Sequence, residues 1–272
     1  AGETQASTYS LGVGNRSMLL GAEIQNPVCK EDSIKLTFKA TNLDGQPVSV
    51  EGNYKLYPVV GGAKSEEVMK GTPAYTGTFV SNKETLLPGW TSVPSGEYLL
   101  VMSAKDDQGR EVTGEEEVIL FSIKDKRPPV DKAIWYYAEN TSFDAAHPAV
   151  FYFGTSKKDA YVMMNLFSGN RMLESKVLRL SDSIERFEYP YKESYGNGLS
   201  ATFCFVKDGS VNQQTVRMTK RLPDKTLTMK WEVFRDKLRP GQEEEWKLTV
   251  KTPQGMPAAA EMLATMYDAS LD

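Results

Sequence analysis

The chain has 272 residues, which is long enough for two or three domains. Its 32 basic and 36 acidic residues give a net charge of −4, which argues against a nucleic-acid-binding protein, whose surface carries a basic surplus. Hydrophobic residues make up 40% and charged residues 25%, so we expect a folded globular protein. No run approaches the roughly 18 apolar residues of a membrane-spanning helix, so we expect no direct membrane insertion.

The first segment is dominated by short strands separated by turn dipeptides. Residues 34–40 alternate apolar and polar side chains, as a half-buried strand requires. The turns Asp44-Gly45 and Gln108-Gly109 separate this strand from others predicted over residues 54–57, 97–102 and 117–123. The stretch at 124–130 has charges and a double proline, so it cannot continue a ladder and indicates a linker.

The second segment has the same pattern of short strands separated by turns. Strands are predicted over residues 149–153, 161–167, 175–180, 186–189, 199–206 and 210–218. Leu222-Pro223-Asp224 indicates a second boundary, and no window of 12 residues has a convincing helical pattern. The sequence therefore predicts an all-β protein of tandem immunoglobulin-like antiparallel β-sandwiches.

An internal repeat sharpens the domain prediction. Residues 35–39 (KLTFK) resemble residues 247–251 (KLTVK), and residues 44–48 (DGQPV) resemble residues 254–258 (QGMPA). The spacing of about 210 residues corresponds to two modules of about 105 residues, the size of an immunoglobulin-like sandwich. We therefore predict one sandwich over 1–127, a second over 128–223, and over 224–272 the beginning of a third, with room for about three strands.

The two ends and the two cysteines bear on the origin of the chain. The start is polar and shows no signal peptide, while residues 262–267 are apolar and strand-like close to the last residue, so we expect a fragment excised from a larger protein. Cys29 and Cys204 are too few for a disulfide scaffold, and a bridge between them is not favoured because they fall in different modules.

The residue types that catalyse reactions or bind metals in other proteins form no recognisable site in this sequence. His147 is the single histidine, and without an evident nucleophile we interpret it as an exposed turn residue. The acidic groups Asp106-Asp107 and 115–117 lack the spacing of a calcium loop and indicate a solvated hairpin rim. The sequence thus predicts no enzyme, no catalytic residue, no metal site and no cofactor.

Aromatic residues could stack on sugar rings, but in a sandwich they usually fill the space between sheets or modules. We favour this core or inter-module interpretation for the aromatic group Trp90, Trp135, Tyr136, Tyr137, Trp231 and Trp246. Because the third module is incomplete, Trp231, Trp246 and Met266 need cover from the preceding sandwich or from another copy of the chain.

The stretch 231–272 contains several distinctive features: the Pro240-Gly241 turn, Trp246 on the following strand, the residues Gly255, Pro257 and Glu261 of a hairpin, and the motif Tyr-Asp-Ala-Ser-Leu at 267–271. In these features the stretch resembles the alpha-2-macroglobulin family of bacteria. The two earlier segments resemble the macroglobulin domains that precede this region, more weakly toward the N-terminus.

The resemblance implies an interior scaffold fragment of a protease inhibitor in the periplasm or at the cell surface, with neighbouring domains and target proteases as partners. In this family a protease cuts a bait segment, the domains close around it, and many members have a Cys-Gly-Glu-Gln thioester. Cys29 and Cys204 are not followed by that motif, so we expect no thioester in this chain. The alternatives are an adhesin or glycan-binding module and, less favoured, a hydrolase on a β-scaffold.

Overall fold

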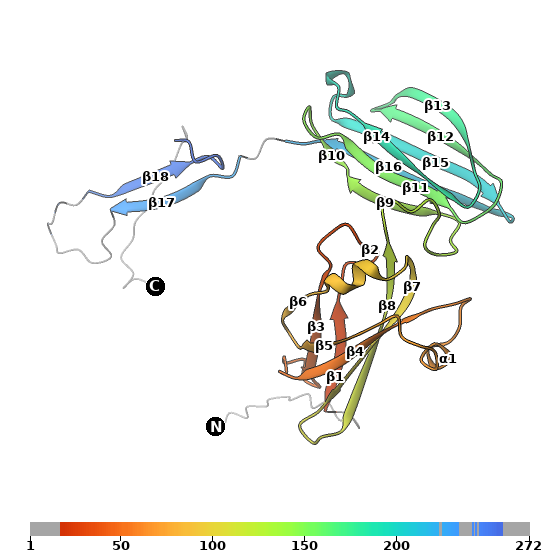
Figure 1. The fold of residues 1–272 in the computed structure, drawn as a ribbon. Coiled ribbons are helices and arrows are strands. Elements are labelled where there is room, and N and C mark those ends of the chain that lie inside the picture. Colours follow the sequence, from red (N-terminus) through yellow and green to blue (C-terminus); the bar gives the residue numbers. More distant parts are fainter. Residues whose placement is uncertain (1–16, 223–224, 234–240, 242, 244, 258–272) are drawn as a thin grey trace, which may run out of the picture. The chain divides into compact units, whose positions relative to one another are not determined.

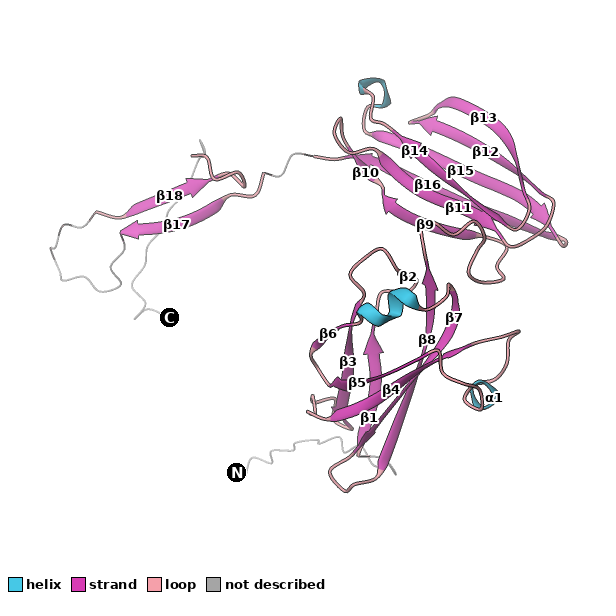
Figure 2. Ribbon diagram, in the orientation of Figure 1, coloured by secondary structure: helices cyan, strands magenta, loops and turns pink. Residues whose placement is uncertain are grey.

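The computed structural model describes residues 17–222, 225–233, 241, 243 and 245–257. The chain divides into two compact units, residues 1–220 and residues 221–272. Apart from one helical turn and two short 3-10 turns, its described regular structure consists of strands (Figures 1 and 2).

The first sandwich in the larger unit is formed by eight strands in two sheets. The three-stranded sheet has the order β1-β3-β6 and the five-stranded sheet the order β2-β8-β7-β4-β5. The strands are β1 (Met18–Glu23), β2 (Val28–Cys29), β3 (Lys35–Asn42), β4 (Glu51–Pro58), β5 (Tyr75–Val80), β6 (Glu84–Leu86), β7 (Gly96–Lys105) and β8 (Glu111–Phe121), with the helix α1 (Ser65–Val68) and the 3-10 turn η1 (Pro88–Ser92) between them.

The second sandwich repeats this topology strand for strand. Its sheets have the orders β9-β11-β14 and β10-β16-β15-β12-β13. The strands are β9 (Trp135–Asn140), β10 (Ser142–Phe143), β11 (Ala149–Thr155), β12 (Ala160–Ser168), β13 (Arg171–Leu180), β14 (Ser183–Tyr189), β15 (Gly198–Lys207) and β16 (Ser210–Lys220), with the 3-10 turn η2 (Glu193–Tyr195) between β14 and β15.

This architecture confirms the prediction of tandem all-β sandwiches. Each strand predicted in these two segments overlaps a strand of the structure, and the short strands β1, β2, β5, β6, β9 and β10 were not predicted. The sheets also differ from the expected antiparallel pattern at one edge, because β2 pairs with β8 and β10 pairs with β16 in parallel. The boundaries at 127/128 and 223/224 stay predictions.

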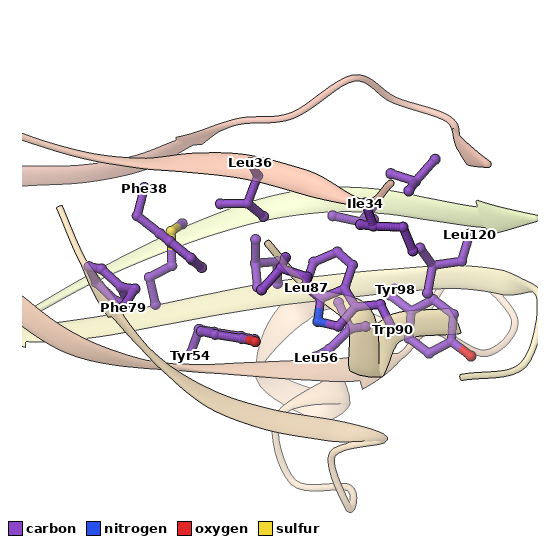
Figure 3. Packing of buried hydrophobic residues seen from close by; sticks show 14 of the residues in the cluster. Ile34, Leu36, Phe38, Tyr54, Leu56, Phe79, Leu87, Trp90, Tyr98 and Leu120 are labelled. Atoms are coloured by element: carbon purple, nitrogen blue, oxygen red, sulfur yellow. The ribbon is translucent and has the colours of Figure 1, made fainter. Parts of the chain in front are cut away.

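Aromatic rings fill the core of the first sandwich (Figure 3). Phe38 on β3 stacks on Phe79 at a centroid distance of 4.3 Å and lies 5.1 Å from the Tyr54 ring. Trp90 on η1 is fully buried and meets Tyr54 edge-on at 6.1 Å. The core interpretation of Trp90 is therefore confirmed.

The second sandwich is built on a phenylalanine cluster. Phe203 on β15 stacks on Phe153 at 4.1 Å and meets Phe151 and Phe187 edge-on at 6.0 and 5.3 Å. Phe151, Phe153 and Phe203 are fully buried, so they join the two sheets across the interior. Edge-to-face and offset-stacked rings of this kind add to the free energy gained by burying their area.

The first sandwich is closed along the seam between β1 and β8. A Cβ atom at Gly114 on β8 would lie 2.4 Å from the Leu20 carbonyl oxygen on β1, so only glycine permits this approach. The opposite seam, between the edge strands β5 and β6, is open and holds a hollow of about 770 Å³ lined by residues of β4, β5 and β6.

The smaller unit contains an antiparallel strand pair, β17 (Thr228–Val233) and β18 (Lys247–Lys251). Trp231 and Trp246 meet edge-on at a centroid distance of 6.3 Å. Met229, Trp231 and Val233 are exposed on β17. Met266, which we expected to need cover, lies outside the described residues.

Candidate functional site: the junction between the two sandwiches

The junction is built around the last residue of β8. Phe121 is buried and its ring lies 5.3 Å from that of Trp135 and 4.5 Å from that of Tyr137, edge-on in both cases. Both partners stand on β9, the first strand of the second sandwich, so the ring of Phe121 packs directly onto the next module. Val130, within the expected linker, is buried in the same cluster. The absence of a strand over 124–130 is as predicted, but this stretch is packed rather than loose.

A carboxylate from the first sandwich fixes the chain as it leaves β8. Glu31, just after β2, accepts hydrogen bonds from the Ser122 hydroxyl, from the Ile123 N–H at 3.1 Å and from the Cys29 thiol at 3.4 Å. Burial would raise the pKa of the Glu31 carboxyl, but these hydrogen bonds outweigh it and hold the pKa below its usual value. The ionised carboxylate therefore orients the first residues of the connection.

Further polar contacts tie the connection to the second sandwich. The Ile184 N–H donates to the Lys126 carbonyl oxygen at 3.0 Å, and the Arg127 guanidinium pairs with the Asp182 carboxylate. The Tyr137 hydroxyl lies 3.5 Å from Asp32, across the junction. An aromatic cluster framed by hydrogen bonds from both modules resists bending better than a bare linker, so the junction can hold one sandwich against the next.

Cys29 lies at the edge of this cluster as a buried free thiol. Burial raises its pKa, which makes the thiolate scarce at neutral pH. Burial likewise raises the pKa of the Tyr137 hydroxyl. A hollow of about 130 Å³ lies beside them, lined also by Asp32 and Lys35. Cys204, on β15 of the second sandwich, is a free cysteine as well.

The other residues considered for chemistry are placed apart from this junction. His147 is exposed, and its Nδ1 lies 2.8 Å from Asp144 within the turn before β11, as expected for a turn residue. Among the described residues no group of three or more His, Cys, Asp or Glu side chains is arranged to hold a metal ion. Within the same described ranges no helix is long and apolar enough to cross a membrane.

The prediction of a solvated rim is wrong for Asp106. Its side chain is only 1% exposed and accepts hydrogen bonds from the Ser17 hydroxyl at 2.7 Å, from the Arg110 N–H at 2.8 Å and from the Arg110 Nε at 2.9 Å. Burial alone would raise the pKa of this carboxyl, but the hydrogen bonds lower it to about 2. Glu115 and Glu117 are exposed on β8, as expected. Sequence reasoning missed Asp106 because one of the partners that bury its side chain, Ser17, is 89 residues away.

Two of the aromatic residues that the glycan-binding alternative needs are buried. Trp90 is fully buried in the first core, and Trp135 is 5% exposed against Phe121. Neither indole face is open to stack on a sugar ring. The inter-module interpretation of Trp135 is confirmed.

Two comparisons with known proteins found nothing: no family model matches the chain, and no curated protein does. The search of solved structures finds alpha-2-macroglobulins of bacteria. The native Escherichia coli protein has 14% identity over 88% of this chain and a TM-score of 0.30. The Salmonella protein reacted with methylamine has 15% identity over 89% and a TM-score of 0.31. The chain spans 18% and 19% of those two proteins, respectively.

Proposed function

We propose that the chain is a non-catalytic scaffold segment of an alpha-2-macroglobulin-like protease inhibitor, a string of similar sandwiches in the periplasm or at the cell surface. The sequence resemblance at 231–272 supports the family, although several residues that carry it, among them Pro240, Glu261 and 267–271, lie outside the described residues. The observation that carries the modular part of the proposal is a turn that occurs twice.

The first copy of the turn follows β3. Gly45 has φ +78° and its N–H donates to the Asn42 carbonyl oxygen at 3.0 Å, while the Asn42 N–H donates to the Gln46 carbonyl oxygen at 2.9 Å. An isolated bridge between Thr41 and Pro47 closes the turn. β3 itself pairs antiparallel with β1.

The second copy follows β18, about 210 residues later. Gly255 has φ +78° and its N–H donates to the Thr252 carbonyl oxygen at 2.8 Å, while the Thr252 N–H donates to the Met256 carbonyl oxygen at 2.8 Å. A bridge between Lys251 and Pro257 closes it, and β18 pairs antiparallel with β17 as β3 does with β1. The match supports β17 and β18 as the first strands of a third sandwich.

The test uses the natural gene product that contains this chain. We expect it to continue through further sandwiches and to shield a bound protease, so that the protease cleaves a small peptide ester but not casein. The 272-residue chain by itself should leave both activities of trypsin unchanged, because it is scaffold. Stoichiometric inhibition of trypsin by the isolated chain would overturn the scaffold role.

A natural product without further sandwiches would overturn the inhibitor proposal itself. Cell fractionation tests the proposed location. We expect the protein in the periplasmic fraction or exposed at the cell surface, and a strictly cytoplasmic protein would contradict the proposed location.

A further inference from the structure

The edge strand β5 lacks the charges and prolines by which proteins keep the edge of a sheet from pairing. Its sequence, Tyr-Thr-Gly-Thr-Phe-Val, contains neither, and its register with β4 runs without a bulge. Its counterpart in the second sandwich, β13, carries four charged side chains within its 10 residues. Among the described edge strands of more than three residues, β5 is the one without a charged side chain. This edge is therefore open to a further strand.

The free side of β5 presents a row of backbone hydrogen-bonding groups. In the described part of the chain, β4 is the only strand that pairs with β5. The Val59 N–H donates to the Glu97 carbonyl oxygen on β7 at 2.8 Å, which fixes the alternation along β4: odd-numbered residues bond to β7 and even-numbered residues to β5. By the register between β4 and β5, the N–H and C=O groups of Thr76, Thr78 and Val80 then point to the open side.

The hollow beside this edge gives a bound strand room for its side chains. Residues of β4, β5 and β6 line its volume of about 770 Å³. Phe79 in its lining is 4% exposed and stacks on Phe38 (Figure 3), whereas Leu86 is 65% exposed. A strand paired with β5 directs every second side chain into the space between the two sheets, where it covers Leu86. Burial of this leucine would add a favourable apolar contact to the backbone hydrogen bonds.

The connection between β5 and β6 holds the hollow in shape. The Ser81 hydroxyl donates to the Val48 carbonyl oxygen at 2.7 Å and accepts from the Val50 N–H at 2.9 Å. Asn82 donates its side-chain amide to the Val48 carbonyl oxygen at 2.9 Å and its N–H to the Phe38 carbonyl oxygen at 2.6 Å. The edge is thus fixed before a partner arrives, which lowers the entropy lost on binding.

The chemistry of this edge identifies its occupant as a linear polypeptide segment. A row of N–H and C=O groups at alternate residues is complementary to another extended backbone, and peptides are commonly bound by strand addition of this kind. The edge strand of a second copy does not fill the hollow, because its inward side chains, Tyr75 and Phe79, are already packed against its own core. The same holds for an edge strand of any other folded sandwich. A linear segment has side chains that are free to enter.

We propose that the open edge of β5 binds a linear, extended segment of another protein by strand addition. The segment matches the six residues of β5, pairs with the backbone groups of Thr76, Thr78 and Val80, and has an apolar side chain at every second position for the hollow. It carries no charge along the paired stretch, since β5 offers none to meet it. The inference does not rest on the proposed function, because it uses the first sandwich alone.

A library of linear decapeptides displayed on phage and selected on the 272-residue chain provides the probe. We expect to recover uncharged peptides with an apolar residue at every second position. Binding of the synthetic, fluorescein-labelled peptide is measured by fluorescence anisotropy. Thr78→Pro removes the outward N–H and leaves the hydrogen bonds to β4, so it should weaken binding at least about tenfold. Thr78→Val keeps the N–H and the shape of the side chain, so this matched control should bind as the unchanged chain does.

N-methylation of the peptide tests the pairing itself and leaves the protein unchanged. Each methyl group removes one backbone donor. We expect methylation at every second residue to weaken binding at least about tenfold, and methylation at the intervening residues to change it less than about twofold, because one side of the segment faces β5. Equal effects at all positions, binding that Thr78→Pro does not weaken, or a library without binders would each overturn strand addition.

Two further measurements separate the other occupants. The 272-residue chain should sediment as a monomer at micromolar concentration, and a dimer that Thr78→Pro dissociates would assign the edge to a second copy. The peptide should bind the natural full-length protein as tightly as the 272-residue chain. Binding that is at least about tenfold weaker there would assign the edge to a segment of the same polypeptide. Either result would overturn a partner on another protein.

Discussion

The two sandwiches share one topology but differ on the outer surfaces of their five-stranded sheets. In the first sandwich, residues 59–74 connect β4 to β5, and the helix α1 in this connection places Val68 against Tyr57 and Leu99. In the second, only Gly169 and Asn170 separate β12 from β13, and nothing in the described chain covers the apolar residues there. The internal core thus determines the topology, while the connections decide which outer surface is covered.

The charges follow the same division. The outer surface of the first five-stranded sheet carries Lys55, Lys105, Glu111, Glu115 and Glu117, all exposed. The same surface of the second sheet, formed by every second residue of β12, β13, β15 and β16, carries no carboxylate. The two sheets therefore differ in surface chemistry although their strand order is the same.

The largest effects on stability should come from substitutions in the two cores. Comparing them tests whether the two sandwiches, which share a topology, lose similar free energies of unfolding. Phe203→Ala removes the ring that joins both sheets of the second sandwich, and Phe38→Ala removes its counterpart in the first. Each should lower the free energy of unfolding by about 3–5 kcal/mol. Urea denaturation followed by circular dichroism measures both.

The same experiment tests the junction. If Phe121 couples the sandwiches, either substitution shifts one common transition. Two separate transitions would contradict that coupling if each substitution shifts only the transition of the sandwich that carries it.

The next comparison concerns the covered and the open outer surface. Leu99 is 6% exposed beneath α1, so Leu99→Ala should cost about 2–4 kcal/mol. Met163 is 51% exposed, so Met163→Ala should change stability by less than about 0.5 kcal/mol. Both variants are measured by urea denaturation of the 272-residue chain, and equal costs would mean that Met163 is packed against another part of this chain.

Local pattern was sufficient to predict the fold class. Residues 34–40 alternate apolar and polar side chains because one face of the strand is buried, and this alternation is visible in the sequence. Strands such as β2 and β10 have two residues each, too few for a period, and they form because their parallel partners β8 and β16 offer an edge. Such elements depend on distant residues and leave no local signal.

The junction could be predicted only in outline. Trp135 was expected in a core or between modules because tryptophan in a sandwich usually fills the space between sheets or modules. The role of Glu31 was not foreseen, since its partners Ser122 and Ile123 are 91 and 92 residues away and are brought to it by the parallel pairing of β2 with β8. Pairing across that distance is a property of the folded chain.

A smaller effect is expected at the junction itself. Glu31→Gln keeps the size of the side chain but removes the charge that strengthens hydrogen bonds from Ser122 and Ile123. We expect a loss of about 0.5–1.5 kcal/mol in the urea-derived stability. Glu117 is an exposed carboxylate on β8 with no ion pair among the described residues, so Glu117→Gln is the matched control and should be neutral. Equal effects of the two substitutions on stability would mean that the Glu31 carboxylate does not stabilise the junction.

The last comparison is between two hairpin turns and depends on pH. The turn after β7 holds Asp106, whose pKa is lowered to about 2, whereas the turn after β15 is formed by the exposed Asp208 and Gly209. An aspartate whose folded pKa lies below its unfolded value of about 3.9 stabilises the fold above that value, and this stabilisation is lost as the pH falls toward 2. The unfolding midpoint in urea should therefore fall between pH 4 and pH 2, and Asp106→Asn should remove part of this fall because its amide does not titrate. Asp208→Asn should leave it unchanged, and the assignment fails if Asp106→Asn preserves the full pH dependence.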